Sequence, residues 1–127
     1  MYIYRAKLDR VIDGDTIDVI VDLGFDVTIK RRLRLKGVNT PELRSKDPDE
    51  RRNALAAKEY VETTLYDNEL VIETFKTRSG KDRRTFGRYV ADVFIDVHTV
   101  DTNIDSDLVS LSEMLVAKGL AEEVNYG

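Results

Sequence analysis

Five residues have the side-chain types of a phosphodiester-hydrolysing centre: Asp15, Arg34, Asn39, Glu42 and Arg88. Carboxylate and amide oxygens, without nitrogen or sulfur donors, suit a hard cation such as Ca²⁺ or Mg²⁺. Two guanidinium groups can clamp a phosphoryl group through paired hydrogen bonds. A carboxylate beside them can take a proton from an attacking water. These residues therefore predict phosphodiester hydrolysis, provided that the fold brings them together.

Each of these residues also has a simpler interpretation when it is taken alone. The segment VIDGDT (11–16) is typical of a tight turn, because Asp-Gly is a strong turn signal. Arg34 alone would be a solvated strand residue, Glu42 a surface carboxylate and Arg88 a cation after a turn. The catalytic interpretation depends on their all lying at strand ends that meet at the mouth of one small barrel.

The first third of the chain has the period of β-strands. Apolar residues recur at every second position through 17–23. After a possible turn at Gly24, one face continues with Val27, Ile29, Leu33 and Leu35. Leu33 and Leu35 share the core-facing side of their strand, so Arg34 must point away from it.

A helix is predicted to follow. Asp47, Pro48 and Glu50 are an N-cap, a first-turn proline and the acid of a capping box. The residues available for its inner stripe are Ala54, Leu55, Ala57, Val61 and Leu65.

Two further strands and a second helix complete the pattern. We expect strands at 69–75 and 88–97, joined by a hairpin loop centred on Gly80. The second helix is predicted to begin at the capping box 110–113 and to end at Lys118-Gly119. The order βββ, α, ββ, α predicts a mainly β (α+β) single domain over 1–127, a small closed barrel with two flanking helices.

Composition excludes several classes of protein. The chain has 127 residues, of which 42% are hydrophobic and 35% charged, as in a globular domain. It has no cysteine and a single histidine, His98, which leaves almost nothing for disulfides, zinc hydrolases or Ser-His-Asp triads. No apolar run is long enough to span a membrane, and residues 1–10 lack the apolar core of a signal peptide. We therefore expect a cytoplasmic protein or the mature form of a secreted one.

Net charge gives a weak guide to partners. The value of −4 argues mildly against a partner held by bulk electrostatics. Screening acts over roughly 8–10 Å, however, so a local cationic cluster can dominate one cleft. Two such clusters are KRRLRLK (30–36) and KTRSGKDRRTFGR (76–88). Nothing indicates an oligomer, so a monomer is the default expectation.

Four segments, taken in order, resemble the successive motifs of the staphylococcal (thermo)nuclease family: VIDGDT (11–16), RLKGVNTPE (34–42), FGRYVADV (86–93) and LSEMLVAKGLA (111–121). The resemblance covers roughly residues 5–121, and four ordered motifs are far more specific than DGDT alone. It implies a five-stranded OB-fold-like Greek-key barrel with two flanking helices. It also implies Ca²⁺-dependent endonuclease hydrolysis of DNA and RNA that leaves 3′-phosphate products.

The resemblance also implies roles for individual residues. Asp15, Asn39 and the backbone carbonyl of Thr40 match the family's calcium ligands, and Glu42 matches the general base for the attacking water. Arg34 and Arg88 match the pair that holds the phosphate and stabilises the transition state. Asp13 and Thr16 are expected to shape the turn or to support the metal ligands from behind, and not to bind the metal directly.

The chain departs from the family's pattern at three places. Asn39 stands where the family has an aspartate, so we predict weakened binding of one Ca²⁺ ion and not its loss. The acidic stretch 96–107 is longer than the usual turn, and its ordinary interpretation is a solvated loop. The family's C-terminal helix and base-stacking tyrosines have no clear match, with Tyr126 at best a substitute.

Two alternatives from other classes remain at this stage. One is a catalytically weak or inactive OB-fold module that binds nucleic acid or protein without cutting. The retention of both arginines and Glu42 argues against it, because a pure binder needs no base beside the phosphate. The other, a calcium-binding structural domain, has no EF-hand loop to support it.

Overall fold

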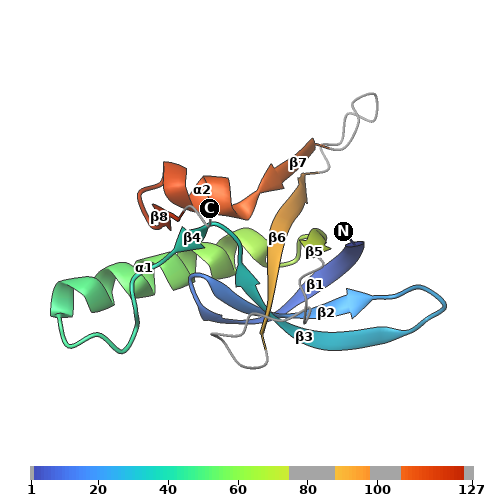
Figure 1. Cartoon of the computed structure of the whole chain (residues 1–127), viewed down its shortest axis with the longest axis horizontal. Coiled ribbons are helices and arrows are strands. Elements are labelled where there is room, and N and C mark those ends of the chain that lie inside the picture. The colour runs from blue at the N-terminus through green and yellow to red at the C-terminus, as the bar shows by residue number, and fades with distance from the viewer. Residues whose placement is uncertain (1, 75–87, 98–106, 125–127) are drawn as a thin grey trace.

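A closed barrel of five strands forms the centre of the computed structural model, which describes residues 2–74, 88–97 and 107–124 (Figure 1). Its strands are β1 (Tyr2–Asp13), β2 (Thr16–Asp22), β3 (Thr28–Leu35), β5 (Leu70–Thr74) and β6 (Arg88–Val97). They lie in the order β3-β2-β1-β5-β6, and a parallel pairing of β3 with β6 closes the ring. All other pairings in the ring are antiparallel. The predicted small barrel is confirmed.

Three short strands that the sequence does not predict are added to this barrel. The strand β7 (Asp107–Ser110) pairs with the far end of β6, and β4 (Val38–Asn39) pairs with β8 (Glu122–Glu123) in a separate two-stranded sheet. The β4–β8 pair draws the segment after β3 toward the end of the second helix. Segments of two to four residues carry too little periodicity to be recognised in advance.

The barrel interior is filled by the alternate apolar residues of its strands. Ile17, Val19 and Leu33 have at most 1% of their surface exposed. Towards the β2–β3 turn the alternate apolar residues no longer lie in the core, and Val27 is 48% exposed. The β2–β3 hairpin extends beyond the rest of the barrel at this end (Figure 1).

The first helix, α1 (Pro48–Leu65), begins as predicted at the N-cap Asp47, whose side chain accepts the N–H of Asp49 at 3.0 Å. The predicted capping box is wrong, because Ser45 Oγ accepts the N–H of Asp47 at 3.1 Å. The Ser45 hydroxyl in turn donates to Glu50 Oε2 at 2.6 Å. The helix packs against β1.

Four of the five residues predicted for the inner stripe of α1 are buried, and these are Ala54, Ala57, Val61 and Leu65. Leu55 is 49% exposed, so its assignment to the stripe is wrong. The four buried residues already follow one another at spacings of three and four, and Leu55 lies about 100° around the helix from Ala54.

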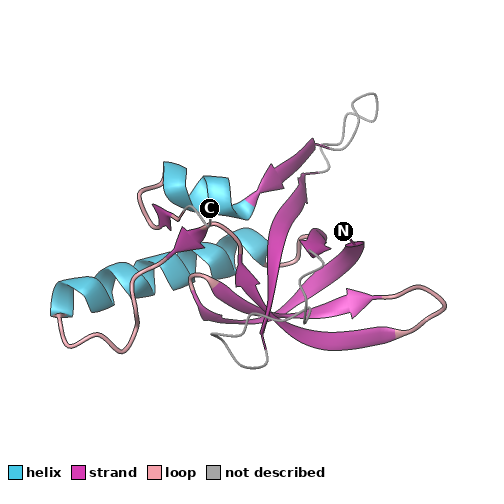
Figure 2. Ribbon diagram, in the orientation of Figure 1, coloured by secondary structure: helices cyan, strands magenta, loops and turns pink. Residues whose placement is uncertain are grey.

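The second helix, α2 (Leu111–Ala117), has the predicted ends (Figure 2). The Ser110 side chain caps its N-terminus by accepting the N–H of Glu113 at 3.3 Å. Lys118 is the C-cap, and Gly119 follows with a φ of +72°, a conformation that glycine adopts at little cost. No helix in the described part of the chain is long and apolar enough to cross a membrane. The hairpin loop around Gly80, His98 and most of the acidic stretch 96–107 lie outside the described residues.

Candidate active site

Asp15 lies in the two-residue turn between β1 and β2, where Asp13 pairs with Thr16. Its Oδ1 accepts the Thr16 hydroxyl at 3.2 Å, and its Oδ2 accepts the backbone N–H of Thr40 at 3.1 Å. Its own carbonyl accepts the N–H of Leu35 at 2.9 Å. The turn interpretation of DGDT is therefore correct, and the turn also fixes the carboxylate against the segment that follows β4.

Gly14 is required at this turn because no side chain fits. A Cβ atom at this position would lie 2.8 Å from Ala57 Cβ on α1 and 2.8 Å from Thr40 Cγ2. Real Cβ contacts are essentially never so short. The helix, the turn and Thr40 are thus packed directly on one another.

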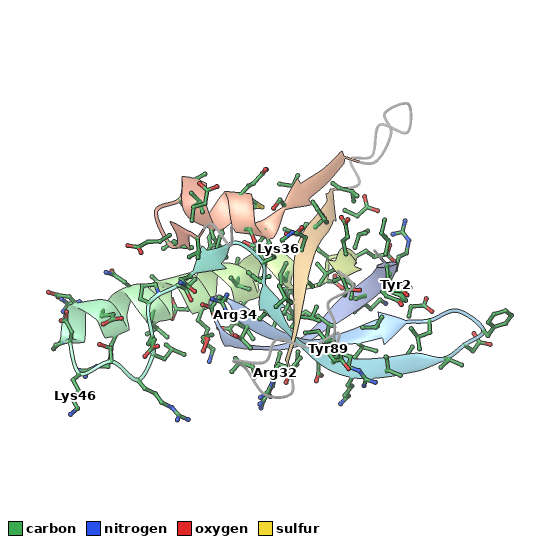
Figure 3. All side chains as sticks on the ribbon, viewed as in Figure 1. Tyr2, Arg32, Arg34, Lys36, Lys46 and Tyr89 are labelled. Carbon is green, nitrogen blue, oxygen red and sulfur yellow. The ribbon has the colours of Figure 1, made fainter. Side chains whose placement is uncertain are left out.

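Arg34, near the end of β3, points away from the barrel core as predicted but is only 9% exposed (Figure 3). Its interpretation as a solvated residue is wrong, because β4 folds over this side of the strand. Nη1 donates to the carbonyls of Leu35 at 3.0 Å and Val38 at 2.8 Å. Nη2 donates to Oδ1 of Asn39 and lies 3.4 Å from Oδ2 of Asp15.

Asn39, Thr40 and Glu42 follow one another on the chain but have different surroundings. Asn39 ends β4 and is exposed, and Thr40 is half-buried. The Thr40 hydroxyl oxygen is buried and has no hydrogen-bond partner within the described residues. Glu42 is exposed, and across residues 2–74, 88–97 and 107–124 its carboxylate forms no ion pair with a described residue.

Arg88 is the first residue of β6, and in the parallel β3–β6 pairing it stands opposite Arg32, two residues before Arg34. Its backbone therefore starts beside the strand that carries Arg34. The structure does not describe the side chain of Arg88 or the residue Tyr126. The fold thus joins Asp15, Arg34, Asn39 and Thr40 by direct contacts and leaves Glu42 nearby in sequence without such a contact.

The oxygen atoms of Asp15, Asn39 and Thr40 suit a hard cation, although only one of the three residues carries a negative charge. Among the described residues no three Asp, Glu or His side chains form a metal-binding group. Asp15 supplies one carboxylate, Asn39 an amide oxygen and Thr40 a carbonyl, all of which are oxygen ligands of the kind that Ca²⁺ takes. The unpartnered Thr40 hydroxyl adds a buried polar atom. These residues fit a calcium ion, although Arg34 already engages two of the same oxygens.

A cavity of about 470 Å³ that Asn39 and Thr40 help to line was not predicted. Its lining includes Glu50 and Asn53 of α1 and residues 119–122 after α2. Only the spacing of Glu50 and Asn53, which places both on one side of the helix, could have suggested that these two side chains act together.

Comparison with known protein families gives a match over most of the chain. Residues 32–127 match the model of the staphylococcal nuclease homologue family, and this range includes Arg34, Asn39, Thr40, Glu42 and Arg88. The chain belongs to this family. The predicted family is therefore confirmed, as is the expected OB-like fold. The DGDT turn precedes the matched range of the staphylococcal nuclease homologue model, so Asp15 is tied to the site by its contacts with Thr40 and Arg34. A comparison with curated proteins gives no match.

Proposed function

We propose that this member of the staphylococcal nuclease homologue family is a Ca²⁺-dependent phosphodiesterase that hydrolyses DNA, RNA or both and leaves 3′-phosphate products. The observation that supports it most is the meeting of Asp15, Arg34 and Asn39, from the β1–β2 turn, β3 and β4. A buried arginine held next to oxygen donors is an arrangement that can receive a phosphate and its counterion together.

Arg34 would hold and neutralise the phosphate. Its hydrogen bonds to the Leu35 and Val38 carbonyls fix the orientation of the guanidinium before substrate binds. A fixed cation that faces the non-bridging oxygens stabilises the charge that accumulates there in the transition state, without a cost of reorganisation. Arg88, which begins β6 beside β3, would be the second cation of the clamp.

Glu42 would act as general base. It would take a proton from a water molecule whose oxygen forms the new bond to phosphorus, while the bond from phosphorus to the 5′ oxygen breaks. The 5′ oxygen leaves as a hydroxyl after protonation, and the phosphate stays on the 3′ side. A Ca²⁺ ion held by Asp15, Asn39 and the Thr40 carbonyl would polarise the phosphate and help to position the water.

One observation favours the alternative, an OB-fold module that binds nucleic acid and cuts weakly or not at all. Arg34 donates to the Asn39 oxygen and lies against Asp15, so a cation must compete with a guanidinium for both side chains. A cleavage assay distinguishes the nuclease from the binding module, whereas a binding assay does not.

The test is cleavage of end-labelled single-stranded DNA and RNA with millimolar Ca²⁺ and with chelator. We expect chelator-sensitive cleavage by the wild type and a loss on the order of 100-fold in Glu42→Gln. Glu59→Gln, an exposed position on α1, is the matched control and should cleave as the wild type does. Tight binding without cleavage at millimolar Ca²⁺ would contradict the enzyme and favour the module.

A further inference from the structure

The outward face of β3 carries a cation at every second residue. Lys30, Arg32 and Arg34 alternate along the strand with residues of the opposite face. One of these is Leu33, which is 1% exposed and lies in the core. Because side chains alternate across a strand, the three cations lie on one face. Their side chains become less exposed toward the candidate active site, from 74% at Lys30 to 42% at Arg32 and 11% at Arg34.

The spacing of this row suits a polyanion. Residues two apart on a strand are separated by about 6.8 Å, which is comparable with the distance between successive phosphates of a stretched single strand. The row lies along a single strand, β3, so it can follow one nucleic-acid backbone. It ends at the hairpin apex, where the acidic Asp22 and Asp26 are exposed.

Each cation of the row has a carboxylate beside it. Arg34 lies 3.4 Å from Oδ2 of Asp15, and the charge of Asp13 also acts on Arg32. Asp18 accepts hydrogen bonds from Arg32 at 2.8 Å and 3.1 Å, and Arg10 shares the same carboxylate at 3.3 Å. Two guanidinium groups therefore face one carboxylate. Among the residues that the structure describes, Lys30 has one ion pair, a long one of 3.8 Å with Asp9. Residues 28–36 hold five cationic residues and no acidic one in a chain of net charge −4.

We propose that the outward face of β3 binds the single nucleic-acid strand next to the candidate active site, with Lys30 and Arg32 each contacting one phosphate. This inference rests on the proposed function and extends it. The phosphate at Arg34 is the one to be cut, and the neighbouring phosphates lie along the row toward the β2–β3 apex. Asp18 holds the Arg32 guanidinium in position on this face.

Salt-dependent binding tests the row in the presence of chelator, where metal-dependent cleavage is stopped. The probe is a fluorescein-labelled single strand of about 12 nucleotides, within the range that one OB-fold covers. In fluorescence anisotropy, Lys30→Ala/Arg32→Ala should lower the slope of log K against log salt by about 1.4, which corresponds to about 25-fold weaker binding at about 0.1 M salt.

The matched control is Arg31→Ala. Arg31 carries the same charge on the same strand and is exposed, but it lies on the opposite face, in register with the buried Val19. The slope for Arg31→Ala should stay that of the wild type. A slope that falls as much in this control as in the double variant would overturn the proposal, since net charge alone would then explain binding. An unchanged slope in the double variant would overturn it as well.

Two further measurements keep the outcome clear. Lys30→Ala alone, which removes only the 3.8 Å contact, should lower the slope by about 0.7 even if the double variant fails to fold. Cleavage of a dinucleotide with Ca²⁺, which is too short to reach Lys30, should be equal in the wild type and the double variant. Absence of Ca²⁺-dependent cleavage of the 12-nucleotide strand by the wild type contradicts the proposed function, whereas an unchanged binding slope contradicts only the phosphate row.

Discussion

The backbone N–H of Thr40 donates a 3.1 Å hydrogen bond to Oδ2 of Asp15, although 25 residues of sequence separate them. The same aspartate accepts the Thr16 hydroxyl through Oδ1 and the Leu35 N–H through its carbonyl. Asp15 is thereby oriented by three contacts from β2, β3 and the segment after β4. Two of the proposed calcium ligands thus move as one unit, and a change that displaces Thr40 also displaces the Asp15 carboxylate.

Gly14→Ala should loosen this unit. The new Cβ would lie 2.8 Å from both Ala57 Cβ and Thr40 Cγ2, so the helix, the turn or Thr40 must shift. Overpacking of this kind costs about 1–3 kcal/mol, and we expect that loss in the free energy of unfolding measured with urea. Ala57→Gly in the same chain removes one of the two clashes and should restore part of the stability in a double-mutant cycle.

Gly24→Ala is the control for this effect. Gly24 has a φ of +80° and no neighbour within 4 Å of an added Cβ, so only backbone strain, of about 1–2 kcal/mol, is expected. Additive effects of Gly14→Ala and Ala57→Gly would show that the two positions do not press on one another.

Arg34→Lys should destabilise the fold although it keeps the charge. Arg34 supplies hydrogen bonds to the carbonyls of Leu35 and Val38, and a lysine cannot reproduce the fork that also reaches Asn39. A buried carbonyl left without its donor costs about 1–3 kcal/mol, to be measured by urea denaturation. Arg31→Lys, at an exposed position, should leave the stability within about 0.5 kcal/mol of the wild type. Wild-type stability in Arg34→Lys would mean that these hydrogen bonds do not hold the site.

Asn39→Asp should tighten calcium binding. One added negative charge close to a divalent ion contributes about 2–3 kcal/mol in a water-like dielectric, on the order of 100-fold in affinity. Arg34, which donates to this side chain, will take up part of the gain by pairing with the new carboxylate. Calorimetric titration with Ca²⁺ measures the difference. Asn53→Asp, which adds the same charge on α1 in the cavity that Asn39 also lines, is the control. Equal affinities in Asn39→Asp and wild type would contradict the assignment of position 39 as a ligand.

Local signals in the sequence account for the elements that were predicted correctly. The N-caps Asp47 and Ser110 each depend on a side chain and an N–H two or three residues away, and the structure has both. The strand at 88–97 has the predicted bounds, because an apolar run flanked by polar loops is a local pattern. The order of such elements was enough to predict the barrel.

Features that depend on distant segments were not predictable. Strand alternation shows on which face Arg34 lies, but its burial comes from β4, whose pairing with β8 joins residues more than 80 positions apart. The contact of Arg34 with Asn39 follows from that same fold-back. The failed capping box has a similar cause on a shorter scale, since Ser45 takes the N–H that Glu50 was expected to bind.

Asp92→Asn should stabilise the protein at neutral pH. Burial is the main cause that raises the pKa of Asp92, with further contributions from Glu73 and Glu113, while Lys36 opposes them. A carboxyl whose pKa is higher in the folded state loses stability as pH rises from the ordinary value of 3.8 through the raised one. The stabilisation by Asp92→Asn should therefore be absent at low pH and complete above the folded-state pKa.

Asp18→Asn is the control, because its sign is the opposite. The hydrogen bond from Arg32 is the main cause that lowers the pKa of Asp18, with the charges of Arg32 and Arg10 acting in the same direction against burial. The stability contributed by Asp18 is present above its ordinary pKa and is lost as pH falls through the lowered value. Urea unfolding between about pH 3 and pH 7 should thus show Asp18→Asn less stable than the wild type at neutral pH and the difference shrinking in acid. If both variants changed stability in the same direction at neutral pH, burial of Asp92 would not be the dominant cause of its raised pKa.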